Sequence, residues 1–303
     1  MRVDPSYATT LVGSLDQAQA NQQQLTQELS SGVSITSLSQ NPVASGENVL
    51  LLNQIQQDDS FTQNSSLVTG QLQVADSTLG SVVSQLTQAI SLATEANNGT
   101  LNPSDVKSVS NQISGILDEV QSLANTSYQG QYIFSGGQTS TAPFSTSTGT
   151  TPAVTTYNGD SDINYLGTPN GQKIQLNVPG SQIFLGAGAN SVFGALNALV
   201  ADYQTGTVNT AQAVSDTTAL SSALGYVSQQ RVTVDNSISQ VTAAGDAVTN
   251  AQTQLTSAQT NLMQADVGTV STQLSLSETQ QTALEDVIAQ MNSSTNDLFS
   301  KLQ

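Results

Sequence analysis

The sequence predicts a mainly α protein: an elongated helical bundle, or coiled coil, that carries a small inserted β domain. In both flanks of the chain, apolar residues recur at helical spacing. In the middle, between Tyr128 and Tyr203, lie nine of the 13 Phe and Tyr residues and four of the seven prolines. Because aromatic and turn-forming residues favour strands and their scarcity favours helices, the middle is the expected β insert.

The N-terminal flank predicts three helices. The second runs from Phe61 to Ala89, and the third begins at Asn102-Pro103, where a capping residue precedes a proline at the first helical position. The first of the three helices carries an amphipathic stripe of apolar residues, which ends before Gly32 and Pro42. The stripe consists of Leu11, Leu15, Ala18, Leu25 and Leu29.

The middle of the chain predicts short strands. Residues 154–157, 163–166, 173–178 and 183–185 alternate partly in hydropathy, and turn pairs such as Asn158-Gly159 separate them. Residues 192–203 then predict a short helix that returns the chain to the bundle.

The C-terminal flank has the clearest periodicity, because apolar residues recur there every seven positions, at Val227, Val234, Val241, Val248, Leu255 and Leu262. A period of 3.5 held this long predicts a long helix that supercoils against a neighbour. After an expected break near Gly268 the apolar pattern resumes at Val270, Leu274, Leu284, Ile288, Met291, Leu298 and Leu302.

Charge and composition exclude several classes of function. The net charge is −17 with five basic residues, too few to neutralise a run of phosphates, so neither nucleic acid nor a membrane surface is an expected partner. Cysteine and histidine are absent, which removes the commonest nucleophile, general base and metal ligands. We expect no catalytic, cofactor-binding or metal site, and therefore no enzyme. No stretch has the length of a membrane span, and the first 20 residues do not read as a secretory signal.

One acidic segment lies in the middle of the chain. Asp160-Ser161-Asp162 begins like a calcium-binding loop, but Tyr165 and Gly171 stand where such a loop needs glycine and glutamate. A structural turn is therefore the prediction.

The apolar stripes at the two ends of the chain leave two alternatives open. They pack on each other within one molecule, or they are assembly segments that order only when several copies meet. On the second alternative, the assembly interface consists of Leu11, Leu15, Leu25, Leu29, Leu284, Ile288, Met291, Leu298 and Leu302.

Four ordered blocks carry a resemblance to a known family. They are Leu29-Ser30-Ser31-Gly32 with the later Asn41-Pro42-Val43-Ala44; the run 130–136 (GQYIFSG); Tyr157-Asn158-Gly159-Asp160; and Gln281-Thr282-Ala283-Leu284. Together they resemble the flagellar hook–filament junction proteins of the hook-associated protein 3 type, which are relatives of flagellin. Residues Gln40 and Asn41 depart from that family's pattern, which has a pair of aspartates there.

The resemblance implies a flagellin-like fold and a structural role. It implies terminal assembly segments at 1–45 and 284–303, disordered in the monomer, a bundle core of 46–135 plus 200–283, and an outward-facing β insert at 136–199. The protein would leave the cell through the flagellar export apparatus and form a ring between hook and filament. Its partners would be copies of itself, the first hook-associated protein, flagellin and an export chaperone. Two alternatives remain: flagellin itself, or a secreted coiled-coil adhesin.

Overall fold

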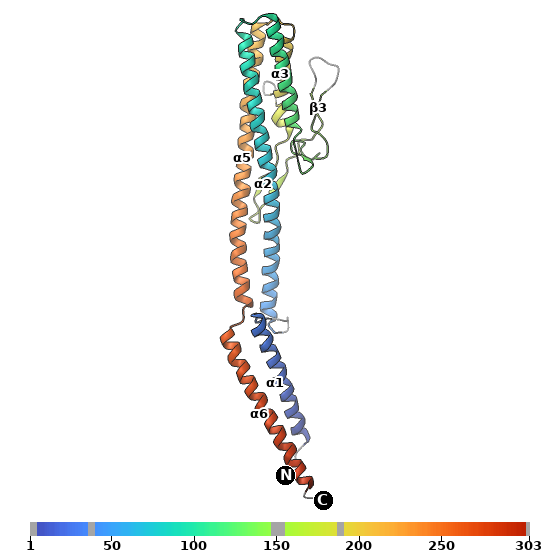
Figure 1. Cartoon of the computed structure of the whole chain (residues 1–303), viewed down its shortest axis with the longest axis vertical. Helices are drawn as coiled ribbons and strands as arrows, with labels where there is room; N and C mark the ends of the chain where they lie inside the picture. Colours follow the sequence, from blue (N-terminus) through green and yellow to red (C-terminus); the bar gives the residue numbers. More distant parts are fainter. Residues whose placement is uncertain (1–4, 36–39, 147–154, 187–190, 301–303) are drawn as a thin grey trace. The chain divides into compact units, whose positions relative to one another are not determined.

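A computed structural model describes residues 5–35, 40–146, 155–186 and 191–300 (Figure 1). The fold is mainly helical, as predicted. Its α-helices are α1 (Pro5–Ser31), α2 (Pro42–Asn97), α3 (Pro103–Ala124), α4 (Val192–Gln204), α5 (Thr210–Met263) and α6 (Val267–Ser300).

The chain forms two compact units. The terminal unit consists of Met1–Gln57 and Ala251–Gln303, and the central unit of Asp58–Asn250. Helices α2 and α5 contribute residues to both units. The predicted break after the long C-terminal helix is present, slightly earlier than expected, between the end of α5 and the start of α6.

The seven-residue repeat of α5 is buried in the central unit. Val227 and Val241 are fully buried there, and Val234 and Val248 nearly so. The repeat therefore marks the face of α5 that packs into the bundle, as its period predicted.

Helix α3 begins where the sequence predicted. The side chain of Asn102 accepts hydrogen bonds from the backbone N–H groups of Ser104 (2.9 Å) and Asp105 (3.0 Å), which satisfies two of the N–H groups left free at a helix start. The helix packs against α4, where the Ser110 hydroxyl donates to the carbonyl oxygen of Val200 (2.8 Å).

The described β structure consists of three antiparallel pairs of short strands. The pairs are β1 (Ser127–Tyr128) with β2 (Gln131–Tyr132), β3 (Phe144–Thr146) with β4 (Thr155–Tyr157), and β5 (Tyr165–Gly167) with β6 (Lys173–Gln175).

The strand predicted at 183–185 is wrong, because η1 (Ser181–Leu185) is a turn of π-helix. Ile183 and Phe184 are both fully buried. Successive side chains of a strand point to opposite faces, whereas η1 buries both side chains in one hydrophobic cluster.

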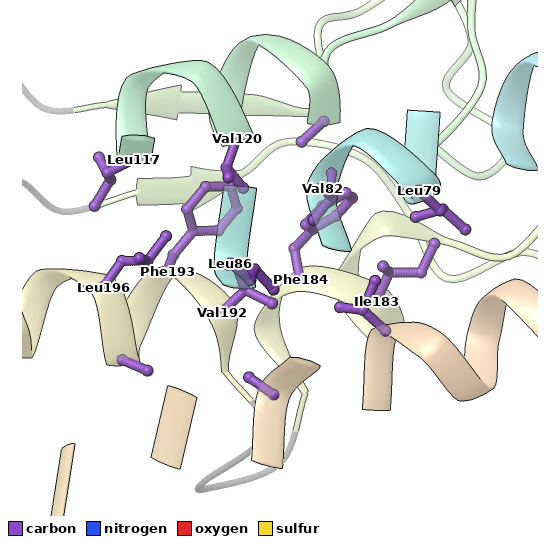
Figure 2. Close-up of a cluster of buried hydrophobic side chains, with 14 of the residues drawn as sticks. Leu79, Val82, Leu86, Leu117, Val120, Ile183, Phe184, Val192, Phe193 and Leu196 are labelled. Carbon is purple, nitrogen blue, oxygen red and sulfur yellow. The ribbon is translucent and has the colours of Figure 1, made fainter. Parts of the chain in front are cut away.

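The insert and the helices share one hydrophobic core. Figure 2 shows Phe184 and Phe193 among side chains of α2 and α3 such as Leu86 and Val120. The ring centroid of Phe184 lies 5.6 Å from that of Phe134, 5.3 Å from that of Phe144 and 5.8 Å from that of Phe193. The insert is therefore anchored to the bundle through its aromatic residues.

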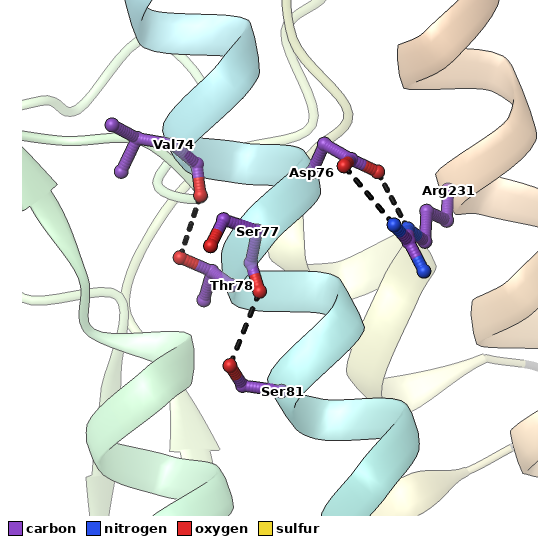
Figure 3. Close-up of polar contacts among 6 residues, drawn as sticks. All are labelled: Val74, Asp76, Ser77, Thr78, Ser81 and Arg231. Carbon is purple, nitrogen blue, oxygen red and sulfur yellow. Dashed lines mark hydrogen bonds and ion pairs between the residues drawn. The ribbon is translucent and has the colours of Figure 1, made fainter.

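Hydroxyl groups on the helices are mostly satisfied by their own helix. In Figure 3 the hydroxyl of Thr78 donates to the carbonyl oxygen of Val74 (2.7 Å), and that of Ser81 donates to Ser77 (3.2 Å). Side chains of this kind need no partner from another helix. A chain so rich in Ser and Thr can therefore form long helices without leaving their hydroxyls unpaired.

Candidate assembly surface

Helices α1 and α6 pack against each other within the terminal unit. Ala18 of α1 is buried, and the buried hydroxyl of Ser277 on α6 donates to its carbonyl oxygen (3.3 Å). The structure thus pairs the two ends, which is the first alternative left open by the sequence. The second alternative, that these segments order only on assembly, stays a prediction.

The predicted interface residues lie mostly along this pair of helices, half-buried. Leu29 is an exception, with 37% of its side chain exposed. Leu298 belongs to α6, but its side chain, like the whole of Leu302, lies outside the described residues. The half-buried members are Leu11, Leu15, Leu25, Leu284, Ile288 and Met291.

The apolar stripe of α1 predicted that Leu29 would be buried, but Glu28 is the buried residue there. The Glu28 side chain is 8% exposed, and its carboxylate oxygen Oε1 accepts a hydrogen bond from Nε2 of Gln24 (2.9 Å). A carboxylate at this place weakens apolar packing at the end of α1. Leu29 is left facing outward, available to another surface.

Two backbone hydrogen bonds connect the segment that follows α1 with the segment that precedes α6. The N–H of Ala265 donates to the carbonyl oxygen of Gly32 (2.9 Å), and the N–H of Ser34 donates to that of Met263 (2.7 Å). Gly32 has φ of +70°, a conformation that favours glycine. This glycine is part of the Leu-Ser-Ser-Gly block of the sequence.

Exposed apolar side chains gather on the terminal unit. Among the described residues, nine of the thirteen large apolar side chains that are exposed belong to it. A monomer gains nothing by exposing apolar surface, and an excess of it on one unit favours a role of that unit in binding. The nine, here called the exposed apolar set, are Val12, Leu29, Val43, Val49, Leu50, Leu52, Val267, Leu276 and Val287.

The start of α2 supplies the members of this set that the sequence reasoning missed. Val43 is 79% exposed and Leu50 is 70% exposed, one heptad apart on the same helix. The signal was present in the run Val49-Leu50-Leu51-Leu52, because four consecutive apolar residues on a helix cannot all face one side.

A groove runs beside the pair of α1 and α6. It has a volume of about 460 Å³, and its apolar lining comes from Ala18, Ala283, Leu284 and Val287. An open groove with an apolar floor can accept side chains from another chain.

The terminal unit should be the less stable part of an isolated chain. Its described buried apolar residues are few, Ala18, Ala44, Ala265 and Val270, and none is larger than valine. A unit whose core is built from such small side chains buries little apolar surface to offset the loss of chain entropy.

In dilute solution, subtilisin should therefore remove residues of the terminal unit first and leave a resistant fragment close to 58–250. Subtilisin is preferred to trypsin because the chain has only five basic residues. Mass spectrometry of the fragments gives the boundaries. Ends that survive as long as the central unit would contradict this prediction.

The acidic loop at Asp160 is held by hydrogen bonds within the chain. Its carboxylate oxygen Oδ1 accepts from the backbone N–H of Gly137 (2.6 Å) and of Asp162 (3.0 Å). This is the structural turn that the sequence predicted. Across the part of the chain that the structure describes, no group of three or more acidic, His or Cys side chains could hold a metal ion. Likewise, none of the described helices is both long and apolar enough to cross a bilayer.

Comparison with known proteins identifies the helical region that carries most of these features. Residues 6–139, from α1 to the start of the insert, match the family described as the bacterial flagellin N-terminal helical region. This stretch, here called the flagellin-type region, is similar to the N-terminal region of bacterial flagellins. This region includes α1, the start of α2 with its exposed apolar side chains, and α3.

Two curated relatives are named flagellar hook-associated protein 3. The one from Salmonella typhimurium is 34% identical over 137 residues, which is 44% of this chain and 42% of the relative. The one from Escherichia coli is 32% identical over 129 residues, 42% of this chain and 41% of the relative. The matched stretch thus spans less than half the length of either relative. The resemblance that the sequence blocks predicted is confirmed.

A solved structure supports the fold. The flagellar hook associated protein-3 from Legionella pneumophila matches with a TM-score of 0.62 at 14% identity, covering 70% of this chain and 98% of the other. At this identity the likeness concerns the fold, which is flagellin-like as predicted.

Proposed function

We propose that the chain is a structural subunit of the bacterial flagellum that forms the junction between hook and filament. The observation that carries the proposal is the exposed apolar set, which lies on the terminal unit and includes the start of α2 within the flagellin-type region. The name shared by both curated relatives, flagellar hook-associated protein 3, supports the same role.

In this proposal, neighbouring subunits cover the exposed apolar set. Segments 1–45 and 284–303, disordered in the monomer, order on assembly. Residues 46–135 with 200–283 form the bundle core, and the insert at 136–199 faces outward. The thin core of the terminal unit supports this division, because helices that are marginal alone gain stability when a neighbour adds apolar contacts.

The partners in this proposal are other copies of the chain in a ring, the first hook-associated protein on one side and flagellin on the other. Export through the flagellar channel, with a chaperone that holds a terminal segment, completes the proposal. The subunit acts through binding, without catalysis.

Deleting the gene in the source bacterium tests the junction role directly. Cells should keep their hooks but release flagellin into the medium, because filament subunits would have no platform. A subunit of the filament itself would give a different result, since its loss would remove flagellin from the medium. Electron microscopy of hooks and immunoblots of the medium distinguish the two outcomes.

The gene-deletion strain also tests whether the exposed apolar set is the assembly surface. A double variant with Val43→Asp and Leu50→Asp should fold normally, because both side chains are exposed, and should fail to restore filaments. The matched control is Val214→Asp with Val232→Asp, which adds the same charge at side chains of the central unit that are 50% and 56% exposed. Normal filaments with the first variant would contradict the proposed surface.

A further inference from the structure

The chain contains three pairs of asparagine followed by glycine, and all three lie in the central unit. At such a pair a chain readily attacks its own side-chain amide, because glycine has no side chain to obstruct the backbone nitrogen. The three pairs share this chemistry, so their surroundings in the fold decide which of them reacts. They are Asn98-Gly99, Asn158-Gly159 and Asn170-Gly171.

The pair at Asn158 is held on both sides. Its amide nitrogen Nδ2 donates to the hydroxyl of Ser145 (3.0 Å), and its backbone N–H donates to the carbonyl oxygen of Pro143 (2.8 Å). Gly159 is closely surrounded, since a Cβ there would lie 2.5 Å from the hydroxyl oxygen of Tyr157. The Asn158 side chain would have to break its contact to reach the backbone nitrogen of Gly159.

The pair at Asn170 lies in the exposed turn between β5 and β6, but its attacking nitrogen is engaged. The N–H of Gly171 donates to the carbonyl oxygen of Thr168 (2.9 Å). The backbone N–H of Gln172 closes the same turn by donating to Oγ1 of Thr168 (3.0 Å). Only the deprotonated backbone nitrogen attacks, and removing a proton that is held in a hydrogen bond also costs that bond.

The pair at Asn98 has neither restraint. It lies between the end of α2 at Asn97 and the start of α3 at Pro103, and both of its residues are exposed. Neither the side chain of Asn98 nor the N–H of Gly99 forms a hydrogen bond with any described residue. Gly99 has φ of +69°, and nothing lies within 4 Å of the position that a Cβ would take. The space for a ring between the two residues is therefore open.

We propose that Asn98-Gly99 is a self-modification site, at which the folded chain converts Asn98 to aspartate and isoaspartate. The backbone nitrogen of Gly99 loses its proton to hydroxide and forms a bond to Cγ of Asn98. The side-chain amide takes up a proton and leaves as ammonia, which closes a five-membered succinimide ring. Water then adds to one of the two ring carbonyls and breaks its bond to nitrogen. The net change is one water consumed, one ammonia released and one carboxylate gained.

The new carboxylate would stand one residue beyond the end of α2. The carbonyl end of a helix carries partial negative charge, so a carboxylate there is unfavourable, and Glu95 already places one in the last turn. Asn97 ties this end to α4 and α5, since it accepts from the hydroxyl of Tyr203 (2.9 Å) and donates to that of Thr217 (3.1 Å). An isoaspartate also lengthens the main chain directly after Asn97. The modification should therefore loosen the end of α2, irreversibly because the ammonia is lost.

Incubation of the full-length chain in mildly alkaline buffer tests the proposal. Digestion with pepsin in acid, followed by mass spectrometry, locates the aspartate and isoaspartate. In the native chain, Asn98 should be converted well before Asn158 and Asn170. In urea this difference should disappear, because the fold no longer distinguishes the three pairs.

Two variants and one mimic complete the test. Asn98→Gln should remove most of the ammonia release, because its longer side chain closes a less favourable six-membered ring. Asn170→Gln is the matched control at an exposed pair and should leave the release nearly unchanged. Asn98→Asp should lower Tm by about 1–3 °C.

Two kinds of result would overturn the proposal. Native Asn158 or Asn170 reacting as fast as Asn98, or undiminished ammonia release from Asn98→Gln, would show that the fold does not select this pair. A wild-type Tm for Asn98→Asp would overturn the inferred loosening of α2.

Discussion

Replacing Phe184 by alanine should destabilise the central unit by about 3–5 kcal/mol. The side chain is fully buried and packs edge-on against Phe134 and Phe144, with interplanar angles of 83° and 79°. Removing it leaves a cavity where the insert meets α2, so both the aromatic cluster and the helix core lose contacts.

Equilibrium urea unfolding of the full-length chain, followed by circular dichroism, measures this loss. Tyr165→Ala is the control, because that side chain is 53% exposed on β5 and its removal should cost less than about 0.5 kcal/mol. A loss below about 1 kcal/mol for Phe184→Ala would mean that the insert does not share its core with the helices.

Removing residues 284–303 should abolish incorporation at the hook tip and leave the melting of the central unit unchanged. The deleted segment carries Leu284, Ile288 and Met291 of the terminal unit, whereas the large hydrophobic cluster of the central unit is built from residues 68–241. Folding and assembly therefore depend on different parts of the chain.

Calorimetry of the truncated chain and complementation of the deletion strain measure the two effects. A full-length chain with Glu285→Ala and Asp286→Ala is the control, because both side chains are exposed on the same helix. Motile cells with normal filaments from the truncated chain would show that the C-terminal segment is not an assembly element.

The helices could be predicted because their signals are local. The valine repeat of α5 and the Asn102-Pro103 start of α3 depend on spacing and capping, which one stretch of sequence contains. The strand error at 183–185 had a non-local cause, since Phe184 meets Phe134 and Phe144 from distant parts of the chain. Tertiary packing there determined the local conformation.

The candidate surface was predicted in part. The apolar stripes of α1 and α6 could be predicted from periodic leucines. That Glu28 is buried and Leu29 is exposed could not, because this depends on how the two helices pack.

The ion pair between Arg231 of α5 and Asp76 of α2 is the only one among the described residues (Figure 3). Its two contacts measure 2.5 Å (Nε to Oδ1) and 3.1 Å (Nη2 to Oδ2). If α5 were shifted along α2 by seven residues, each valine of the repeat would take the place of the next valine. The repeat alone therefore does not determine the alignment of the two helices. The same shift would set the guanidinium against Thr69 or Val83, and neither offers the pair of charged oxygens that the guanidinium contacts in Asp76. The charged contact therefore favours the observed alignment of α2 and α5 over alignments shifted by one heptad.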